Sequence, residues 1–196
     1  MPTTPQTARS ERTRSALLKA AMVRFLAQGV DATTAEQIAT DAGVTLRTFY
    51  RHFGSKHDLL FADYDSGLHW FRRALSERPT GEPVIASVNA AIFAFPYDVD
   101  AVMQIANLRV GTLDPSRIVQ HMRRVQSDFA HALLDHLHRR HPDADELGVT
   151  VAARAIAAAV FAGMEVWLQR DDRSLPELAQ VSRDALEAIS PAFRHY

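Results

Sequence analysis

The chain has 196 residues, of which 47% are hydrophobic and 23% are charged, which is the balance of a soluble globular protein. It contains no cysteine, so disulfides and thiolate metal sites are excluded. The first ten residues lack the apolar segment of a secretory signal. The longest apolar stretch, 149–168, is interrupted by Arg154 and Glu165, which are costly inside a bilayer. We therefore expect this stretch to be a buried helix and the protein to be cytoplasmic.

Charge is unevenly distributed along the chain, although the formal net charge is only −1. Residues 1–60 contain eight Lys/Arg and five Asp/Glu, whereas acids outnumber bases in the remainder. A basic N-terminal segment is typical of nucleic-acid binding, but solvated helices often have the same composition. Composition alone therefore leaves both interpretations open.

The sequence predicts an all-α fold, because apolar residues recur at helical spacing and Gly and Pro fall between the periodic segments. The second helix begins with Thr34-Ala35-Glu36-Gln37, which is a capping box. About nine helices are expected, over residues 10–28, 34–43, 45–54, 55–78, 83–95, 98–112, 116–140, 146–170 and 175–189.

The strongest functional signal is the segment 34–60, TAEQIATDAGVTLRTFYRHFGSKHDLL. Two short helices meet at Gly43, and a glycine there can take the positive φ that a sharp helix crossing requires. The first turn of the second short helix is polar, and in a helix-turn-helix this end enters the major groove of DNA. The helix after it opens with Ser55-Lys56, and free N–H groups at such an end suit a phosphate. A plain helical hairpin would explain the turn alone equally well.

The same segment resembles the DNA-binding motif of the tetracycline-repressor (TetR) family of bacterial regulators, from the first helix to the start of the fourth. The resemblance implies a helix-turn-helix domain over 1–54 and a ligand-binding and dimerisation domain over 55–196, with 55–78 as connector. It implies a homodimer that binds double-stranded operator DNA and a small-molecule effector, with no cofactor. By position, Tyr50 and Lys56 are expected to contact phosphates. The other expected DNA-binding residues are Thr34, Thr45, Leu46, Arg47, Thr48, Arg51 and His52.

Aromatic, methionine and polar side chains within the remaining helices are candidates for an effector pocket. They favour a mainly apolar ligand, and Arg109 would add an anchor for an anionic group. Each has a structural alternative, because rings and a histidine often belong to a core, and Arg109 can pair with an acid such as Glu165. The expected ligand-binding residues are Trp70, Phe71, Phe93, Met103, Arg109, Phe129, His136, Phe161 and Glu165.

Small residues along 146–170 would let two helices approach closely, which favours a dimer surface shared with the final helix. An internal core helix would show the same composition. The expected dimer residues are Ala155, Ala158, Ala162, Val166, Leu178 and Ala185.

Motifs for catalysis are not found: the sequence has no nucleophile–base pair, Gly-rich phosphate loop or His-Glu zinc spacing. Asp128, His131, Asp135 and His138 share one face of a single helix, and one straight helix rarely closes a metal shell, so no metal site is expected. The sequence therefore predicts a ligand-responsive repressor that binds a pseudo-palindromic operator, and not an enzyme. The alternatives are an activator, or a helical carrier or enzyme with an incidental DNA-binding module.

Overall fold

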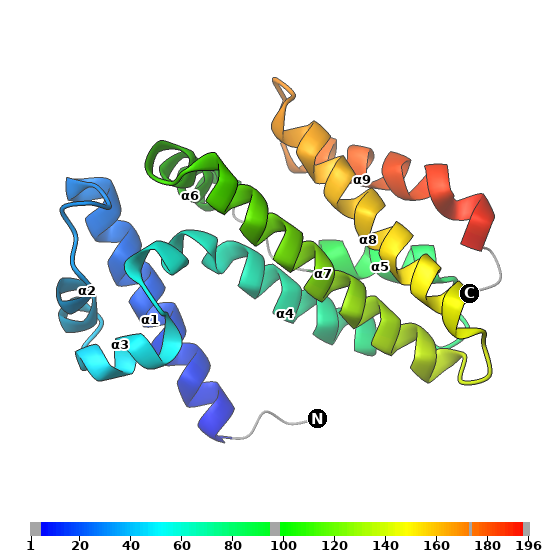
Figure 1. Cartoon of the computed structure of the whole chain (residues 1–196), viewed down its shortest axis with the longest axis horizontal. Helices are drawn as coiled ribbons and strands as arrows, with labels where there is room; N and C mark the ends of the chain where they lie inside the picture. The colour runs from blue at the N-terminus through cyan, green and yellow to red at the C-terminus, as the bar shows by residue number, and fades with distance from the viewer. Residues whose placement is uncertain (1–4, 95–98, 173, 194–196) are drawn as a thin grey trace. The chain divides into compact units, whose positions relative to one another are not determined.

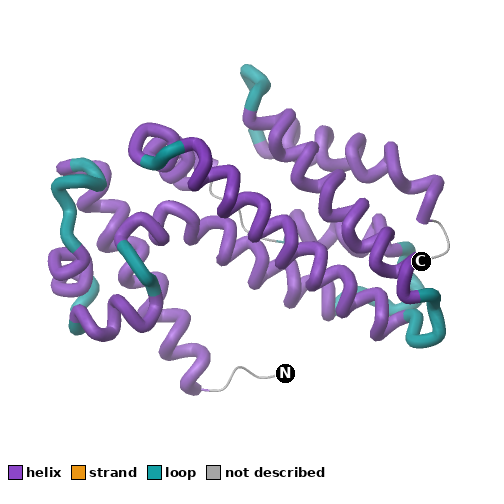
Figure 2. Tube along the Cα trace, viewed as in Figure 1, coloured by secondary structure: helices purple, strands orange, loops and turns teal. Residues whose placement is uncertain are grey.

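A computed structural model describes residues 5–94, 99–172 and 174–193, and every regular element in these ranges is helical (Figures 1 and 2). The prediction of an all-α fold is confirmed. The elements are α1 (Pro5–Gln28), α2 (Ala35–Asp41), α3 (Leu46–His52), the 3-10 segment η1 (Lys56–Phe61), α4 (Ala62–Ser76), α5 (Val84–Phe93), α6 (Val99–Thr112), α7 (Pro115–Arg140), α8 (Glu146–Leu168), α9 (Leu175–Ile189) and the 3-10 segment η2 (Ser190–Phe193).

The predicted helix boundaries agree with the structure to within two residues, apart from two differences. Helix α1 begins at Pro5, five residues before the predicted start. The segment predicted to open the fourth helix is the 3-10 segment η1, and the α-helix begins only at Ala62. The predicted break at Pro96 lies outside the described residues.

The chain divides into two compact units. Unit 1 comprises residues 1–63 and 100–118, and unit 2 comprises residues 64–99 and 119–196. Unit 1 is therefore larger than the helix-turn-helix domain predicted over 1–54, because it includes η1 and α6. That residues 1–54 form the DNA-binding domain stays a prediction.

The core of unit 1 is an apolar stripe on α1, onto which α2 and α3 pack. On α1, Leu17, Ala21 and Phe25 are buried, and they are joined by Ile38 of α2 and Phe49 of α3. At seven residues each, α2 and α3 are too short to be stable alone, so burial against α1 must hold them.

The turn between α2 and α3 depends on Gly43, whose φ is +67°. A β-carbon at this position would meet no atom within 4 Å, so space does not require the glycine. The left-handed backbone does, because a side chain disfavours that conformation.

Helix α6 is attached to η1 by a buried arginine. The guanidinium of Arg109 donates to both carboxylate oxygens of Asp63, each at 2.7 Å, and its Nε donates to the Leu60 carbonyl at 2.7 Å. It also lies over the ring of Phe61, 5.3 Å from the centroid. Arg109 is only 3% exposed, so its charge is neutralised and hydrogen-bonded inside unit 1.

The core of unit 2 contains three aromatic rings, of which Phe129 contacts the other two. Phe71 of α4 stacks on Phe129 of α7 with ring centroids 3.8 Å apart, and Phe161 of α8 meets Phe129 edge to face at 5.8 Å. Helix α9 packs closely along α8 near Gly163, where an added β-carbon would lie 3.4 Å from the Ala185 β-carbon. Helix α8 therefore packs closely on α9 and meets α7 through the contact between Phe129 and Phe161.

Helix α8 is long and apolar enough to cross a membrane by length and composition, with a mean hydropathy of 1.8 over its best window. Eight of its residues, including Ile156 and Trp167, are buried within the protein. The helix thus serves as a core element of unit 2, as the sequence predicted.

A second feature of unit 2 is a polar network around Arg140, at the end of α7. Its guanidinium donates to the carbonyls of Thr80 and Glu82, to the Ser87 hydroxyl and to Nε2 of His136. Because arginine can only donate, Nε2 must accept, and His136 is therefore neutral. Burial and then the nearby Arg140 charge lower the pKa of His136 to about 4.

Gly43→Ala should destabilise the protein by about 1–2 kcal/mol, because the new side chain has to adopt the left-handed conformation. Gly67→Ala is the matched control: Gly67 lies within α4, and an added β-carbon meets no atom there within 4 Å. It should stabilise by roughly 0.5–1 kcal/mol. Urea unfolding followed by circular dichroism measures both, and equal effects would contradict the role given to Gly43.

Stability should fall as the pH drops from about 6.5 towards 4, because the unfolded chain binds a proton at His136 that the folded chain does not. The folded pKa lies below the unfolded value, so the contribution is complete above pH 6.5. It amounts to at most about 3 kcal/mol. Urea unfolding at several pH values should give a shallower dependence for His136→Gln than for the wild type. Equal slopes would show that His136 titrates normally.

Candidate nucleic-acid interface

The first turn of α3 presents a polar surface with a fixed backbone. Thr45 caps the helix: its hydroxyl accepts from the Thr48 N–H at 3.2 Å and lies 3.0 Å from the Thr48 hydroxyl. Arg47 and Arg51 are exposed, and Tyr50 is 54% exposed. Tyr50 is held by an edge-to-face contact with the buried Phe49 ring, 5.3 Å between centroids. The helix therefore offers two guanidiniums, hydroxyls and a phenol on a rigid support.

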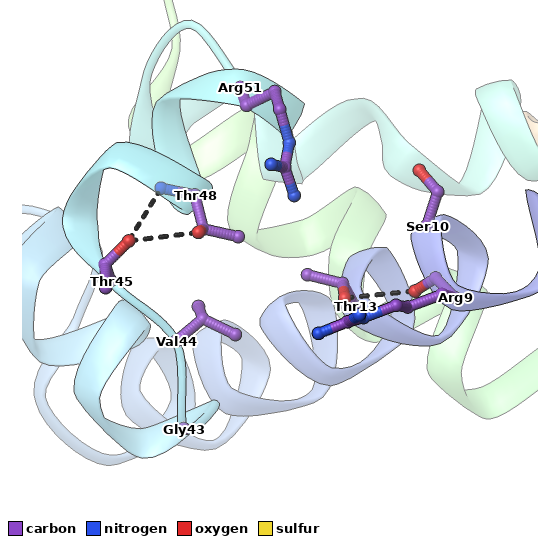
Figure 3. Close-up of a pocket in the computed structure, with 8 residues that line it drawn as sticks. All are labelled: Arg9, Ser10, Thr13, Gly43, Val44, Thr45, Thr48 and Arg51. Carbon is purple, nitrogen blue, oxygen red and sulfur yellow. Dashed lines mark hydrogen bonds between the residues drawn. The ribbon is translucent and has the colours of Figure 1, made fainter. Parts of the chain in front are cut away.

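A groove of about 650 Å³ separates this surface from the N-terminal part of α1. Figure 3 shows Thr48 and Arg51 of α3 on one side, and Arg9, Ser10 and Thr13 of α1 on the other. The groove thus brings together two guanidiniums and several hydroxyls, all of which are donors that suit phosphate oxygens.

The α1 side of this groove was not identified from the sequence. Arg9 lay before the predicted start of the first helix, and Ser10 and Thr13 belong to no motif. The structural reason is that α1 begins at Pro5, so that its first turns extend alongside α3. The excess of basic residues in the first 60 positions was the available signal.

The Lys56 ammonium, which the sequence predicted to contact a phosphate, is engaged by backbone carbonyls. It donates to three backbone carbonyls in the turn between α1 and α2, those of Val30 at 2.8 Å and of Asp31 and Thr33 at 2.9 Å each. An ammonium has three N–H donors, so all of them are used. Lys56 therefore fastens η1 to this turn.

The predicted phosphate site at Ser55 is also occupied from within the chain. The Ser55 N–H donates to the Asp58 carboxylate at 3.0 Å, and the Ser55 hydroxyl does so at 2.9 Å. The Ser55 N–H and hydroxyl are thus engaged by a carboxylate of the same turn.

The remaining predicted DNA-binding residues differ in exposure. Thr34 is exposed and caps α2, since its hydroxyl accepts from the Gln37 N–H. Leu46 is half-buried on α3. His52 is half-buried as well, and burial, with Arg51 and Arg14 nearby, lowers its pKa, which favours the neutral ring.

The structure brings together only part of the predicted ligand-binding set. Phe71, Phe129 and Phe161 form the ring cluster of unit 2, and Phe93 is half-buried on α5. His136 belongs instead to the Arg140 network. The other members lie elsewhere: Trp70 is 38% exposed on α4, Glu165 is exposed on α8, and Met103 and Arg109 belong to unit 1.

The ion-pair partner of Arg109 is Asp63 rather than Glu165. Since both oxygens of Asp63 accept from it, Arg109 is not available as a free anchor for an anionic effector. The sequence placed Arg109 correctly in an apolar helix, but it gave no sign of an acid 46 positions away.

The predicted dimer residues lie mainly on the outer face of α8. Ala158, Ala162 and Val166 are exposed, and Ala155 is half-buried. Leu178 of α9 is half-buried. Two further apolar side chains on the outer surface of α8 were not in the predicted set, Leu147 at 70% and Val151 at 49% exposure.

The last member of that set, Ala185, packs against Gly163 of the same chain.

Among the described residues no group of three or more His, Cys, Asp or Glu side chains is placed to hold a metal ion.

Comparisons with known proteins agree with this geometry. The model of the family "Bacterial regulatory proteins, tetR family" matches residues 17–62, which include α2, α3 and η1. The transcriptional regulator TcmR of Streptomyces glaucescens is 30% identical over 192 residues, covering 92% of this chain and 84% of its own length.

Solved structures share the fold over most of the chain. The repressor SmeT of the Stenotrophomonas maltophilia multidrug efflux pump SmeDEF superposes with a TM-score of 0.57 at 21% identity, covering 92% of this chain and 89% of its own. SmeT in complex with triclosan gives 0.55 at 22% identity, with 92% and 90% covered. Family members are regulators that bind operator DNA, typically as dimers. With its helix-turn-helix, its all-helical second unit and a relative matched along most of both chains, the protein belongs to the TetR family of bacterial transcriptional regulators.

Proposed function

We propose that this TetR-family regulator, a ligand-responsive repressor, binds a pseudo-palindromic operator in the cytoplasm as a homodimer. In each copy, the first turn of α3 enters the major groove, while the groove between α1 and α3 holds the DNA backbone. The observation that carries the proposal is the arrangement of Arg47, Tyr50 and Arg51 on one exposed helix beside Arg9.

Different roles follow from where these side chains lie. Arg47 follows the cap of α3, the end that meets base edges in helix-turn-helix proteins, and a guanidinium there suits the two acceptors of guanine. Arg9 and Arg51 line opposite sides of the α1–α3 groove and suit phosphates, whose contacts fix register without reading sequence.

A homodimer is supported by the outer face of α8. The stripe of exposed Val151, Ala158, Ala162 and Val166 is apolar and small, which suits close packing against the same helix of a second copy. Twofold symmetry presents two α3 helices to successive major grooves, roughly 34 Å apart, and the operator is then a pseudo-palindrome.

A mainly apolar effector is supported by the ring cluster of Phe71, Phe129 and Phe161. The rings come from three different helices, so a ligand that separates them would shift α4 against α7 and α8. To release DNA, such a ligand must bind the released form more tightly, by about 5.5 kcal/mol for a shift from 1:99 to 99:1.

The sharpest test of the DNA-binding surface compares Arg47→Ala with Arg51→Ala. After an operator has been selected from random duplexes, fluorescence anisotropy measures affinity for it and for single-base variants. Arg47→Ala should cost about 1–3 kcal/mol and relax preference at one base pair in each half-site. Arg51→Ala should weaken binding to all sequences and reduce the slope of log affinity against log salt by about 1.

Arg139→Ala on α7 is the control, because this exposed arginine lies in unit 2 and should leave both readouts unchanged. If Arg47→Ala keeps both affinity and base preference, the recognition surface is assigned wrongly. If the wild type selects no sequence at all, the repressor assignment itself fails.

Lys56→Ala should destabilise the protein by about 1.5–3 kcal/mol, because three carbonyls lose a charged donor. Lys19→Ala is the matched control, since Lys19 is the only other lysine of the chain and is exposed on α1, and should change stability by less than about 0.5 kcal/mol. Urea unfolding measures both. In Lys56→Ala the slope of log affinity for DNA against log salt should stay unchanged. A decrease as large as that of Arg51→Ala would show that Lys56 contacts a phosphate after all.

A further inference from the structure

A second groove, of about 300 Å³, lies between α7 and α8 within unit 2. Its walls come from the middle of α7 (123–134) and the first half of α8 (150–157). Its volume falls at the lower end of the range for small-molecule sites. None of its lining residues belongs to the helix-turn-helix or to the ring cluster of Phe71, Phe129 and Phe161. The groove shares only the helices α7 and α8 with that cluster.

The groove is basic, and its charges are not neutralised from within the chain. Arg123 on α7 and Arg154 on α8 both line it and are exposed, and His131 adds a third basic group. In the part of the chain that the structure describes, neither arginine has an ion pair or a hydrogen bond. None of the ten lining residues is acidic.

Of the acids nearest to the lining residues in sequence, Asp128 and Glu146 are engaged, and Asp135 is exposed but does not line the groove. Asp128 pairs with Arg124 at 3.9 Å and accepts at its carbonyl from Arg72, while Glu146 contacts His138 at 2.9 Å. Two guanidiniums from different helices therefore line a shared hollow in which no lining residue is acidic, which favours the binding of an anion.

The floor of the groove is apolar and made of small side chains. Ala153 and Ala157 of α8 are buried, and Ala130 and Leu134 of α7 are half-buried. Alanines leave room where larger residues would fill the space between the helices. A ligand here would thus meet methyl groups on one side and guanidiniums at the rim, with hydroxyls of Ser127 and Thr150 beside them.

We propose that this α7–α8 groove binds a small amphipathic carboxylate, an aromatic or acyl acid. Its carboxylate would accept hydrogen bonds from Arg123 and Arg154, and its apolar body would lie on the alanine floor. A strongly polar anion such as inorganic phosphate would leave that floor uncovered, and a neutral aromatic compound would leave the two guanidiniums unpaired.

As an effector site, the groove deepens the proposed function and rests on it, because it supplies the anionic contact that Arg109 cannot. As a binding site, the groove can be tested on the protein without DNA. Helix α8 carries the groove on one side and the exposed Val151–Val166 stripe on another, so a ligand that draws α7 and α8 together would act next to the proposed dimer surface.

The test uses 2-naphthoate as the probe and its neutral analogue 2-naphthamide, titrated into the full-length protein by calorimetry at low salt. Naphthoate should bind the wild type about tenfold more tightly than naphthamide, the difference expected for a charge-assisted hydrogen bond. The double variant Arg123→Gln/Arg154→Gln should lose that advantage and bind both probes alike. Ser127→Phe, which fills the groove and keeps its charge, should weaken both.

Arg139→Gln is the matched control, since it removes an exposed arginine of α7 that does not line the groove, and it should leave both affinities unchanged. The site is overturned if naphthoate fails to bind at millimolar concentration, if the double variant binds it as the wild type does, or if Arg139→Gln weakens it equally. Operator affinity measured with and without naphthoate separates the two proposals. If naphthoate binds in the groove without changing operator affinity, the binding site stands and its effector role is overturned. The repressor assignment is tested separately, by operator binding in the absence of naphthoate.

Discussion

Two helices of seven residues each cannot hold their shape alone, and this constraint explains most of unit 1. Helices α2 and α3 depend on burial in a shared core, in which Ile38 and Phe49 are buried as are Leu17 and Phe25 of α1. Each also needs its own cap, Thr34 for α2 and Thr45 for α3, since short helices have proportionally more unpaired N–H groups. The exposed side chains of α3, such as Arg47 and Arg51, lie outside this core.

Beyond this apolar core, two cations join segments that are distant in sequence. Lys56 fastens η1 to the turn between α1 and α2, and Arg109 fastens α6 to η1 through the Leu60 carbonyl and to the start of α4 through Asp63. Both make several hydrogen bonds at once, which offsets the cost of removing their charge from water. The short 3-10 segment η1 is therefore held from two sides.

Most of the fold could be predicted from the sequence because it depends on local patterns. The periodic apolar residues gave the helices, the capping box placed α2, and Gly43 gave the turn. The partners of Lys56 and Arg109 could not be predicted in the same way. They lie 23–26 and 46–49 positions away, and nothing in the local sequence distinguishes a lysine that contacts carbonyls from one that contacts phosphate.

The candidate sites differ in the same way, between those that depend on a local motif and those that depend on contacts between distant segments. Arg47, Tyr50 and Arg51 belong to a local motif, so the sequence alone was enough to propose them. Both grooves depend on which faces of separate helices meet, and small residues such as Ala153 that create the hollow resemble ordinary core residues. Sequence could show that Arg154 interrupts an apolar helix, but not that Arg123 faces the same hollow.

The engagement of Lys56 has a consequence for covalent chemistry at the proposed DNA-binding surface. The chain has only two lysines, and the amine of Lys56 is already committed to three carbonyls, while Lys19 does not line the groove beside α3. The cations that face that groove are arginines, which neither acetylation nor amine-coupling reagents neutralise. The protein could therefore be attached to a sensor surface through Lys19 with its guanidiniums intact, and lysine acetylation in a cell would leave the charge of this surface unchanged.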